Sequence, residues 1–302
     1  MFGLLIGCFA LGALARRMPS IPREAPKVLN AWVLNVSLPA LVLKTVHGVA
    51  LAPSVLVGAV TLWMLFLLVA GAALLAVKRG WASREVAGAL ALSAGLGNTA
   101  FVGVPLVEAL GGPGAVGPAA LLDQLGSFLI FSAAAVPFAM IMGGASPSAG
   151  VVLRRLATFP PFVALLLAFV LRPFAFPEGV ESVLTRLGSM VTPLALASVG
   201  WQLELSGMKG QLGAMATGLV WKLLLAPAVM LGVVWLVGAP TGLEAKVAVA
   251  QAAMAPMVTA AVLATEHRLA ASLSAALAAL GAAMSFVTVP AWWAVLGRVF
   301  GE

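Results

Sequence analysis

The sequence predicts an all-α polytopic membrane protein with ten transmembrane helices, built as two inverted five-helix repeats with broken, crossing helices 4 and 9. The first observation is composition: 62% of the residues are hydrophobic and 9% are charged, whereas soluble domains carry about 25% charged residues. The second is a series of apolar blocks, several longer than the roughly 18 residues that mark a spanning helix. The third is that two blocks, one in each half, are interrupted near their centres.

Charged residues and clusters of Gly and Pro divide the chain into ten apolar segments. In chain order they cover residues 2–15, 28–47, 53–77, 85–110, 115–141, 156–171, 181–203, 212–237, 244–266 and 272–297. The first segment ends at Ala15 and is followed by Arg16 and Arg17, whereas a secretory signal carries its positive charge before the apolar run. We therefore expect residues 2–15 to form a short first transmembrane helix.

The distribution of Lys and Arg predicts the orientation. The loops after segments 1, 3, 5, 7 and 9 carry eleven of these residues, Lys209 among them, and the opposite side carries five. Because cytoplasmic loops carry the excess, we expect the first set in the cytoplasm and both termini outside the plasma membrane. The net charge of +7 is spread in small groups between apolar blocks, which argues against a nucleic-acid-binding face.

The segments also divide into two copies of a five-helix unit. Residues 1–142 form the first repeat, residues 151–302 form the second, and the Ser-, Pro- and Gly-rich stretch 143–150 connects them. Pro39 in segment 2 and Pro193 in segment 7 lie at related positions, and segments 4 and 9 share the central interruption. Because five is odd, the second copy enters the membrane inverted, as in many secondary transporters.

The interruptions of segments 4 and 9 indicate a binding site. The first contains Gly97, Asn98, Thr99, Gly103 and Pro105, and the second contains Gln251 and Pro256. Asn98 lies 14 residues past Arg84 and Pro256 lies 12 past Glu244, so the two breaks fall at matching depths. Paired interruptions of this kind point to the substrate site of a secondary transporter, and we expect these residues and Pro39 to contact the substrate.

A break inside the bilayer leaves backbone N–H and C=O groups without hydrogen-bond partners, so it persists only within protein or beside water. We expect Gly97 to relax the backbone, Asn98 and Thr99 to cap the next half-helix, and Pro256 to lie in the first turn of the other half-helix. By the predicted orientation, the two half-helices direct their N-termini at each other and form an anion-binding centre. A small carboxylate is the simplest ligand. The alternative is that Gly and Pro merely kink packed helices.

Asp123 is the only acidic residue well inside a segment, about 12 Å from the start of segment 5 at the helical rise. A charge at the centre of a membrane helix costs roughly 2.5–3.5 kcal/mol, so Asp123 is expected to face the bundle. One hypothesis is that it couples transport to an ion, as a proton carrier or in a sodium site with Asn98 and Thr99. Gln124 and Thr259 are further candidates for this role. The alternative is a structural, hydrogen-bonded Asp.

Lys222, inside segment 8, is the remaining charged candidate, and three roles are open for it. It is suited to lining an anion pathway, to pairing with Asp123, or to extending its stem towards the interface. Two distant His residues and one Cys give no metal-site spacing. Neither Gly-x-Ser-x-Gly nor a Walker-type motif occurs. We therefore expect neither an enzyme nor a bound cofactor or metal.

The run Gly97-Asn98-Thr99-Ala100-Phe101-Val102-Gly103-Val104-Pro105 resembles the fourth-helix motif of the auxin efflux carrier family, within the superfamily of bile acid, arsenite and riboflavin transporter-like proteins. Other positions agree with the family in order along essentially the whole chain. They are Leu38-Pro39-Ala40-Leu41, Asp123-Gln124, Lys222 with Pro227, and Ala255-Pro256.

The resemblance implies an elevator-type carrier of small organic anions such as malate, malonate or auxin-like acids. It also implies a scaffold domain from helices 1, 2, 6 and 7, a transport domain from helices 3–5 and 8–10, and a homodimer. Asn98 matches one of two asparagines that hold the carboxylate in plant members. Met254, Ala255 and Met257 stand where the second is expected, a departure that favours a bacterial-type member.

Two other interpretations fit the same residues. One is a carrier similar to the sodium/bile-acid symporters, which share the crossed-helix architecture and would require sodium. The other is a membrane protein that binds a ligand without net transport. The sequence therefore leaves open whether a proton or a sodium ion accompanies the anion.

Overall fold

The computed structural model describes residues 2–49, 52–202, 211–238 and 242–300. The predicted end of segment 7 at residue 203 and the loop residue Lys209 lie outside these ranges. All named elements of the described residues are helices, joined at one point by an isolated β-bridge.

The first half of the chain forms segments 1 to 5. Its elements are α1 (Phe2–Ala15), α2 (Ala25–Trp32), η1 (Val33–Ser37), α3 (Leu38–His47), α4 (Pro53–Lys78), α5 (Arg84–Gly95), η2 (Thr99–Gly103), α6 (Val104–Gly111), η3 (Pro113–Ala115), α7 (Val116–Leu121), η4 (Leu122–Phe128), η5 (Phe131–Ala135) and α8 (Val136–Met142).

The second half forms segments 6 to 10. Its elements are α9 (Ala149–Thr158), α10 (Pro160–Val170), α11 (Glu178–Ser189), α12 (Val191–Trp201), α13 (Leu212–Val220), η6 (Trp221–Leu225), α14 (Ala226–Leu236), α15 (Leu243–Ala252), α16 (Val258–Glu266) and α17 (Ala271–Phe300). The connecting stretch is shorter than expected, because α9 begins at Ala149. Arg154 and Arg155, which the predicted segment bounds place between segments 5 and 6, therefore lie on a helix.

Six continuous helical runs in the described residues are long and apolar enough to cross a membrane. The number rises to seven if α9 and α10, bent by 63°, form one span. Segment 1 is a 14-residue helix, about 21 Å long at 1.5 Å per residue, and segments 4 and 9 are each divided into shorter helices. The chain is thus an all-helical polytopic membrane protein, while the count of ten and the inverted repeat stay predictions.

Widened π-helical turns precede prolines in four of the segments. The π turns η1, η2, η5 and η6 are each followed by an α-helix with proline in its first two positions, at Pro39, Pro105, Pro137 and Pro227. Proline lacks the N–H for the helical ladder and its ring collides with the preceding turn. A wider turn accommodates both effects without ending the helix.

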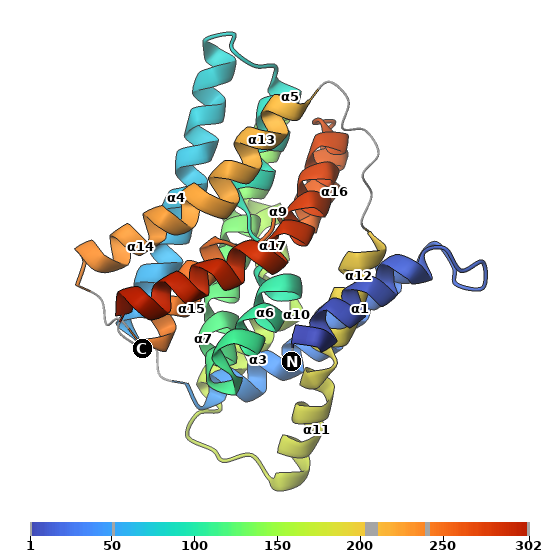
Figure 1. The fold of residues 1–302 in the computed structure, drawn as a ribbon, viewed down its shortest axis with the longest axis vertical. Coiled ribbons are helices and arrows are strands. Elements are labelled where there is room, and N and C mark those ends of the chain that lie inside the picture. Colours follow the sequence, from blue (N-terminus) through green and yellow to red (C-terminus); the bar gives the residue numbers. More distant parts are fainter. Residues whose placement is uncertain (1, 50–51, 203–210, 239–241, 301–302) are drawn as a thin grey trace.

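The helices pack in two groups (Figure 1). In the first group α1 lies beside α12, α2 contacts α12, and α3 contacts α10 and α11. The second group contains α4 to α8 and α13 to α17, in which α4 contacts α5 and α15, and α16 contacts α17. The groups meet where α3 contacts α7 and where α12 contacts η2. The functional division into a scaffold and a transport domain stays a prediction.

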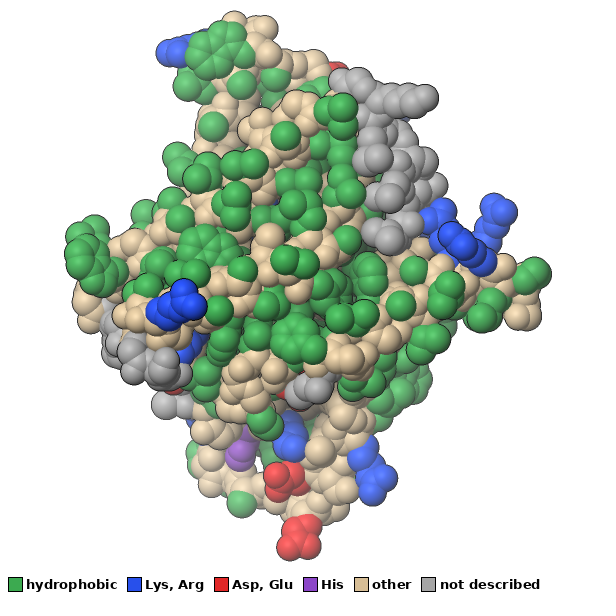
Figure 2. Space-filling view, in the orientation of Figure 1, with side chains coloured by type: hydrophobic (Ala, Val, Ile, Leu, Met, Phe, Trp, Pro, Cys, Tyr) green, Lys and Arg blue, Asp and Glu red, His purple; other side chains and the backbone are tan. Residues whose placement is uncertain are grey.

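The outer surface is apolar. Figure 2 shows hydrophobic side chains over the face formed by α13, α14 and α17, with basic side chains gathered towards the periphery. On α4, Leu56, Val60, Met64 and Leu67 are each 46–59% exposed at helical spacing along one face. Water does not favour such contiguous apolar surface, so this face is suited to contact with lipid.

Two glycines allow α1 and α12 to approach closely. A Cβ added at Gly12 would collide with the backbone carbonyl of Ala197, and one added at Gly200 would collide with that of Phe9. Small residues are characteristic of membrane helix interfaces, where van der Waals packing replaces the hydrophobic effect. The reciprocal contact fixes α1 against α12 although α1 is short.

We expect Gly12→Ala to destabilise the protein by about 1–3 kcal/mol, because its methyl group must separate two backbones. Gly7→Ala is the matched control on the same helix, since a Cβ there meets nothing within 4 Å. It should be neutral or stabilising by about 0.5–1 kcal/mol, because alanine favours helix. Thermal unfolding in detergent checks both. Equal melting temperatures would contradict the proposed close contact.

Candidate functional site

Segments 4 and 9 are both interrupted, and their interruptions lie against each other. Helix α5 ends at Gly95 and η2 begins at Thr99, while α15 ends at Ala252 and α16 begins at Val258. Between them Gly97 and Pro256 form an antiparallel β-bridge. We call residues 96–98 and 253–257 the crossover.

Two backbone hydrogen bonds hold the crossover together. The N–H of Asn98 donates to the carbonyl of Ala255 at 2.7 Å, and the N–H of Met257 donates to the carbonyl of Leu96 at 3.0 Å. These bonds pair groups that a broken helix would otherwise leave unsatisfied in an apolar medium. A short antiparallel pairing of the two segments thereby replaces the missing helical turns.

The expectation that Pro256 lies in the first turn of the following half-helix is wrong. Pro256 lies inside the crossover. Helix α16 begins at Val258 after Met257, whose backbone is extended. The proline ring packs against α17 at Gly281, where an added Cβ would collide with it. Proline suits this position because the bridge takes its hydrogen bonds from the neighbouring residues, which leaves no N–H unpaired at Pro256 itself.

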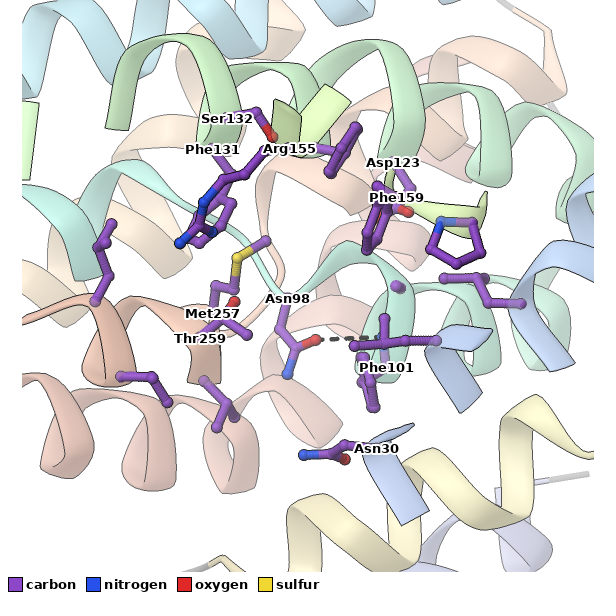
Figure 3. Close-up of a pocket in the computed structure, with 18 of the residues that line it drawn as sticks. Asn30, Asn98, Phe101, Asp123, Phe131, Ser132, Arg155, Phe159, Met257 and Thr259 are labelled. Atoms are coloured by element: carbon purple, nitrogen blue, oxygen red, sulfur yellow. Dashed lines mark hydrogen bonds between the residues drawn. The ribbon is translucent and has the colours of Figure 1, made fainter. Parts of the chain in front are cut away.

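Asn98 caps the half-helix that follows the first break, as expected. Its Oδ1 accepts a hydrogen bond from the N–H of Phe101 at 3.2 Å. The cap occupies the carbonyl oxygen of the side chain with this hydrogen bond and leaves the NH₂ group free. Figure 3 shows the Asn98 nitrogen directed away from the capped helix, towards the side on which Asn30 lies.

Asp123 is tied to the crossover through Thr99. The Thr99 hydroxyl donates to Oδ1 of Asp123 at 2.5 Å, and Gln124 Nε2 donates to Oδ2 at 2.7 Å. Thr99 is therefore bonded to Asp123 rather than acting as a second side-chain cap. Asp123 is 5% exposed and lies in the π turn η4. Its oxygens are hydrogen-bonded on both sides, and no described residue forms an ion pair with it.

Gln251 supports the crossover from the protein interior. Its Nε2 donates to the carbonyls of Thr99, at 3.3 Å, and Ala119, at 3.1 Å, so it links α15 to η2 and α7. Gly103 provides the space, because a Cβ there would collide with Oε1 of Gln251. Gln251 is fully buried, so its contacts support the site from within the protein.

Lys222 also lies at the crossover, with no ion pair to Asp123. It is 2% exposed, and a Cβ added at Gly97 would lie 3.1 Å from its Nζ and 3.4 Å from the carbonyl oxygen of Gln251. The ammonium group therefore lies near the C-terminal ends of α5 and α15. Those ends carry partial negative charge, which a buried cation balances.

A cavity of about 510 Å³ opens beside the crossover, between the two helix groups (Figure 3). Asn98, Asp123 and Thr259 line it among the residues expected at the site. Pro39 lines a separate hollow between α3 and α10, and Pro105 is buried in α6. Ala100, Val258 and Thr259 belong to the first turns of η2 and α16, so the N-terminal ends of both half-helices reach the cavity.

The structure adds cavity residues that sequence reasoning missed, chiefly Arg155 of α9 and Asn30 of α2, with Ser132 and Gln202. The guanidinium of Arg155 lies 5.5 Å from the centre of the Phe131 ring and supplies a full positive charge. Arg155 is one of the basic residues between segments 5 and 6 that predict the orientation, and nothing in its surroundings in the sequence distinguishes it from Arg154. Asn30 carried a detectable signal, as a polar residue within an apolar segment.

No group of three or more His, Cys, Asp and Glu side chains with the arrangement of a metal site occurs among the described residues. The charged groups around the cavity are Arg155, Asp123 and Glu266. The cavity thus combines one side-chain cation and two carboxyl groups with two positive helix ends and several neutral hydrogen-bond donors. The helix ends and donors at the crossover suit a group with hydrogen-bond acceptors.

The comparisons with known proteins agree with this architecture. The model of a family described as membrane transport protein matches residues 4–293. The chain belongs to this family. It is the auxin efflux carrier family that the helix 4 motif resembles. A protein of Methanothermobacter thermautotrophicus described as an uncharacterized transporter is 28% identical over 292 residues, which cover 95% of this chain and 94% of that protein. Membership of the family makes this chain a membrane transport protein.

We expect Gly103→Ala to weaken the crossover, because the new methyl group must displace the Gln251 amide and its two hydrogen bonds. Loss of these bonds in a buried site should cost about 1–3 kcal/mol. Thermal unfolding of Gly103→Ala, Gln251→Ala and the double variant checks this. The cost of Gly103→Ala should fall in the Gln251→Ala background, and a full additive cost would contradict the argument.

Proposed function

We propose that the protein is a secondary transporter that moves a small organic anion across the plasma membrane by alternating access. One observation carries the proposal: two antiparallel interrupted segments meet at a β-bridge, and the half-helices that follow both interruptions begin at one cavity. The alternative is a non-transporting ligand-binding protein, and measured flux distinguishes the two.

The groups at the crossover and the size of the cavity support an organic anion. Asp123 and Glu266 place two carboxyl groups at the cavity, and against them the N-terminal end of each half-helix contributes about half a positive charge, Arg155 contributes a full one, and the free NH₂ group of Asn98 provides a donor. A volume of about 510 Å³ lies within the roughly 300–1,000 Å³ typical of small-molecule sites. The apolar side chains of Phe101, Phe128 and Phe159 line the remaining wall and suit the carbon skeleton of an organic acid.

The division of the helices supports an elevator-type movement. The crossover and Asp123 belong to the second group, whereas α2, α3 and Gln202 supply the opposite wall from the first group. If the second group moves relative to the first, it carries the helix ends and the bound anion with it. Arg155 and Glu266 border the cavity on the side that the charge distribution assigns to the cytoplasm. We therefore propose that this conformation faces inward.

Asp123 is the proposed coupling residue, with a proton as the coupled ion. Its two carboxyl oxygens already accept hydrogen bonds from Thr99 and Gln124, and it borders the cavity in a membrane-embedded π turn. A proton on this carboxyl would remove a buried charge. Sodium coupling through Asn98, Thr99, Asp123 and Thr259 is the second candidate, favoured by the clustering of their oxygens near one cavity.

We expect Arg155→Gln to raise the KM for uptake at least about tenfold, because it removes the side-chain cation at the cavity. Arg154→Gln is the matched control, since Arg154 lies beside Arg155 in the same helix but does not line the cavity. Uptake by proteoliposomes is measured for radiolabelled acetate, malonate, malate and indole-3-acetate. Lack of uptake and of counterflow for all four by the unmodified protein would contradict the proposed transport of this class of anion.

We expect Asp123→Asn to abolish the response of uptake to an imposed pH gradient while counterflow persists, because Asn keeps the size of the side chain and one acceptor oxygen but does not take up a proton. Initial rates are compared with and without the gradient, in sodium and in choline buffers. Unchanged stimulation by the gradient in the variant would refute the role of Asp123. Strict dependence on sodium in the unmodified protein would favour the second candidate ion.

A further inference from the structure

Asn30 is held in place by a hydrogen-bond chain within the first helix group. Ser198 of α12 donates from its hydroxyl to Oδ1 of Asn30 at 2.6 Å, with a longer approach of 3.3 Å to the carbonyl of Pro26. Gln202 Nε2 donates to the Ser198 hydroxyl at 3.0 Å and to its carbonyl at 3.1 Å. Ser198 is fully buried, so the central link between Asn30 and Gln202 is shielded from water.

The direction of this chain fixes the orientation of the Asn30 amide. A serine hydroxyl has one hydrogen to donate, and the shorter of its two contacts directs that hydrogen to Asn30 Oδ1. The carbonyl oxygen of the side chain therefore faces α12, and the NH₂ group is left for the cavity that Asn30 lines. Each donor polarises the next group along the chain, which strengthens Asn30 as a donor.

Asn98, which belongs to the second helix group, also directs a side-chain NH₂ towards the cavity. Its Oδ1 is committed to the N–H of Phe101, so its NH₂ group also faces the cavity. Figure 3 shows the Asn98 amide above Asn30, with the two nitrogens directed into the same open space. No described residue accepts a hydrogen bond from either NH₂ group. Two donors do not bond to each other, so an acceptor between them satisfies both.

We propose that Asn30 is a substrate-contacting, specificity-determining residue that pairs with Asn98 to hold one oxygen-bearing group of the substrate between the two helix groups. The inference rests on the proposed transport function and deepens it. The pair selects an acceptor-rich group such as a carboxylate, and the substrate bridges the two groups in this conformation. Ser198 is a positioning residue that acts through Asn30.

The test compares Asn30→Ala with Asn35→Ala in proteoliposome uptake and in thermal-shift assays with acetate, malonate, malate and indole-3-acetate. Asn35 lies in the same segment and lines the same cavity, but its Nδ2 donates to the carbonyl of Ala31 at 2.7 Å. Asn30→Ala should raise KM about tenfold, with little change in maximal rate, because a donor to a charged group is lost. Asn35→Ala should change KM less than about threefold.

Two further variants, Asn30→Asp and Ser198→Ala, distinguish a substrate contact from a structural role. Asn30→Asp still accepts the Ser198 hydrogen bond but presents a carboxylate to the cavity, so it should raise KM more than Asn30→Ala does. Ser198→Ala should raise KM without lowering the maximal rate. Combined with Asn30→Ala, it should add no further increase, because both changes act on one contact. A purely structural role for Ser198 would instead give additive effects and a lower melting temperature.

The outcomes separate this inference from the proposed function. Stabilisation of the unmodified protein by a carboxylate, lost in Asn98→Ala but retained in Asn30→Ala, would overturn the role of Asn30 alone. Equal effects of Asn30→Ala and Asn35→Ala would also overturn it. If none of the four carboxylates stabilises the unmodified protein or is taken up by it, the proposed function fails, and this inference fails with it.

Discussion

The antiparallel bridge between Gly97 and Pro256 joins two interrupted helices within an apolar bundle. Hydrocarbon provides no partners for free N–H and C=O groups, so each interruption requires the other to satisfy its backbone. The bridge also forces the two following half-helices to begin at neighbouring points, which brings two positive ends to one cavity. The electrostatics of the site therefore follow from backbone pairing.

The residues around the bridge divide into those that support it and those that face the cavity. Gln251 and Lys222 are buried on the protein side, where one bonds to neighbouring carbonyls and the other lies near the C-terminal helix ends. Asn98 and Asp123 border the cavity, and Thr99 connects the two sides through its hydroxyl. A substitution on the supporting side should consequently alter binding through the shape of the crossover.

The positions of the two interruptions were predictable because they depend on local chemistry. Gly97 with the capping Asn98 marks the first break, and Pro256 within an apolar run marks the second, so both breaks could be located from sequence alone, whereas the position of Pro256 ahead of α16 could not. The cavity lining was harder to predict. The orientation of Asn30 depends on Ser198, 168 residues away, and no local pattern reveals that pairing. Arg155 shows a second difficulty, since a basic residue beside an apolar block looks the same whether it faces solvent or a cavity.

The π turns before the prolines have a consequence for how the chain tolerates insertions and deletions. Such a turn contains one residue more than an α-helical turn, and each residue of an α-helix advances the side chains by about 100°. The wider turn absorbs its additional residue with little change of phase, so removing one residue from Val33–Ser37 would restore a regular helix with α3 still facing its present neighbours. It would also bring Pro39 against the preceding turn. A deletion within Leu38–His47 would instead rotate every later side chain of α3 by about 100° away from its partners. The π turn is thus the place where this span accommodates one residue more than a regular helix without losing its packing.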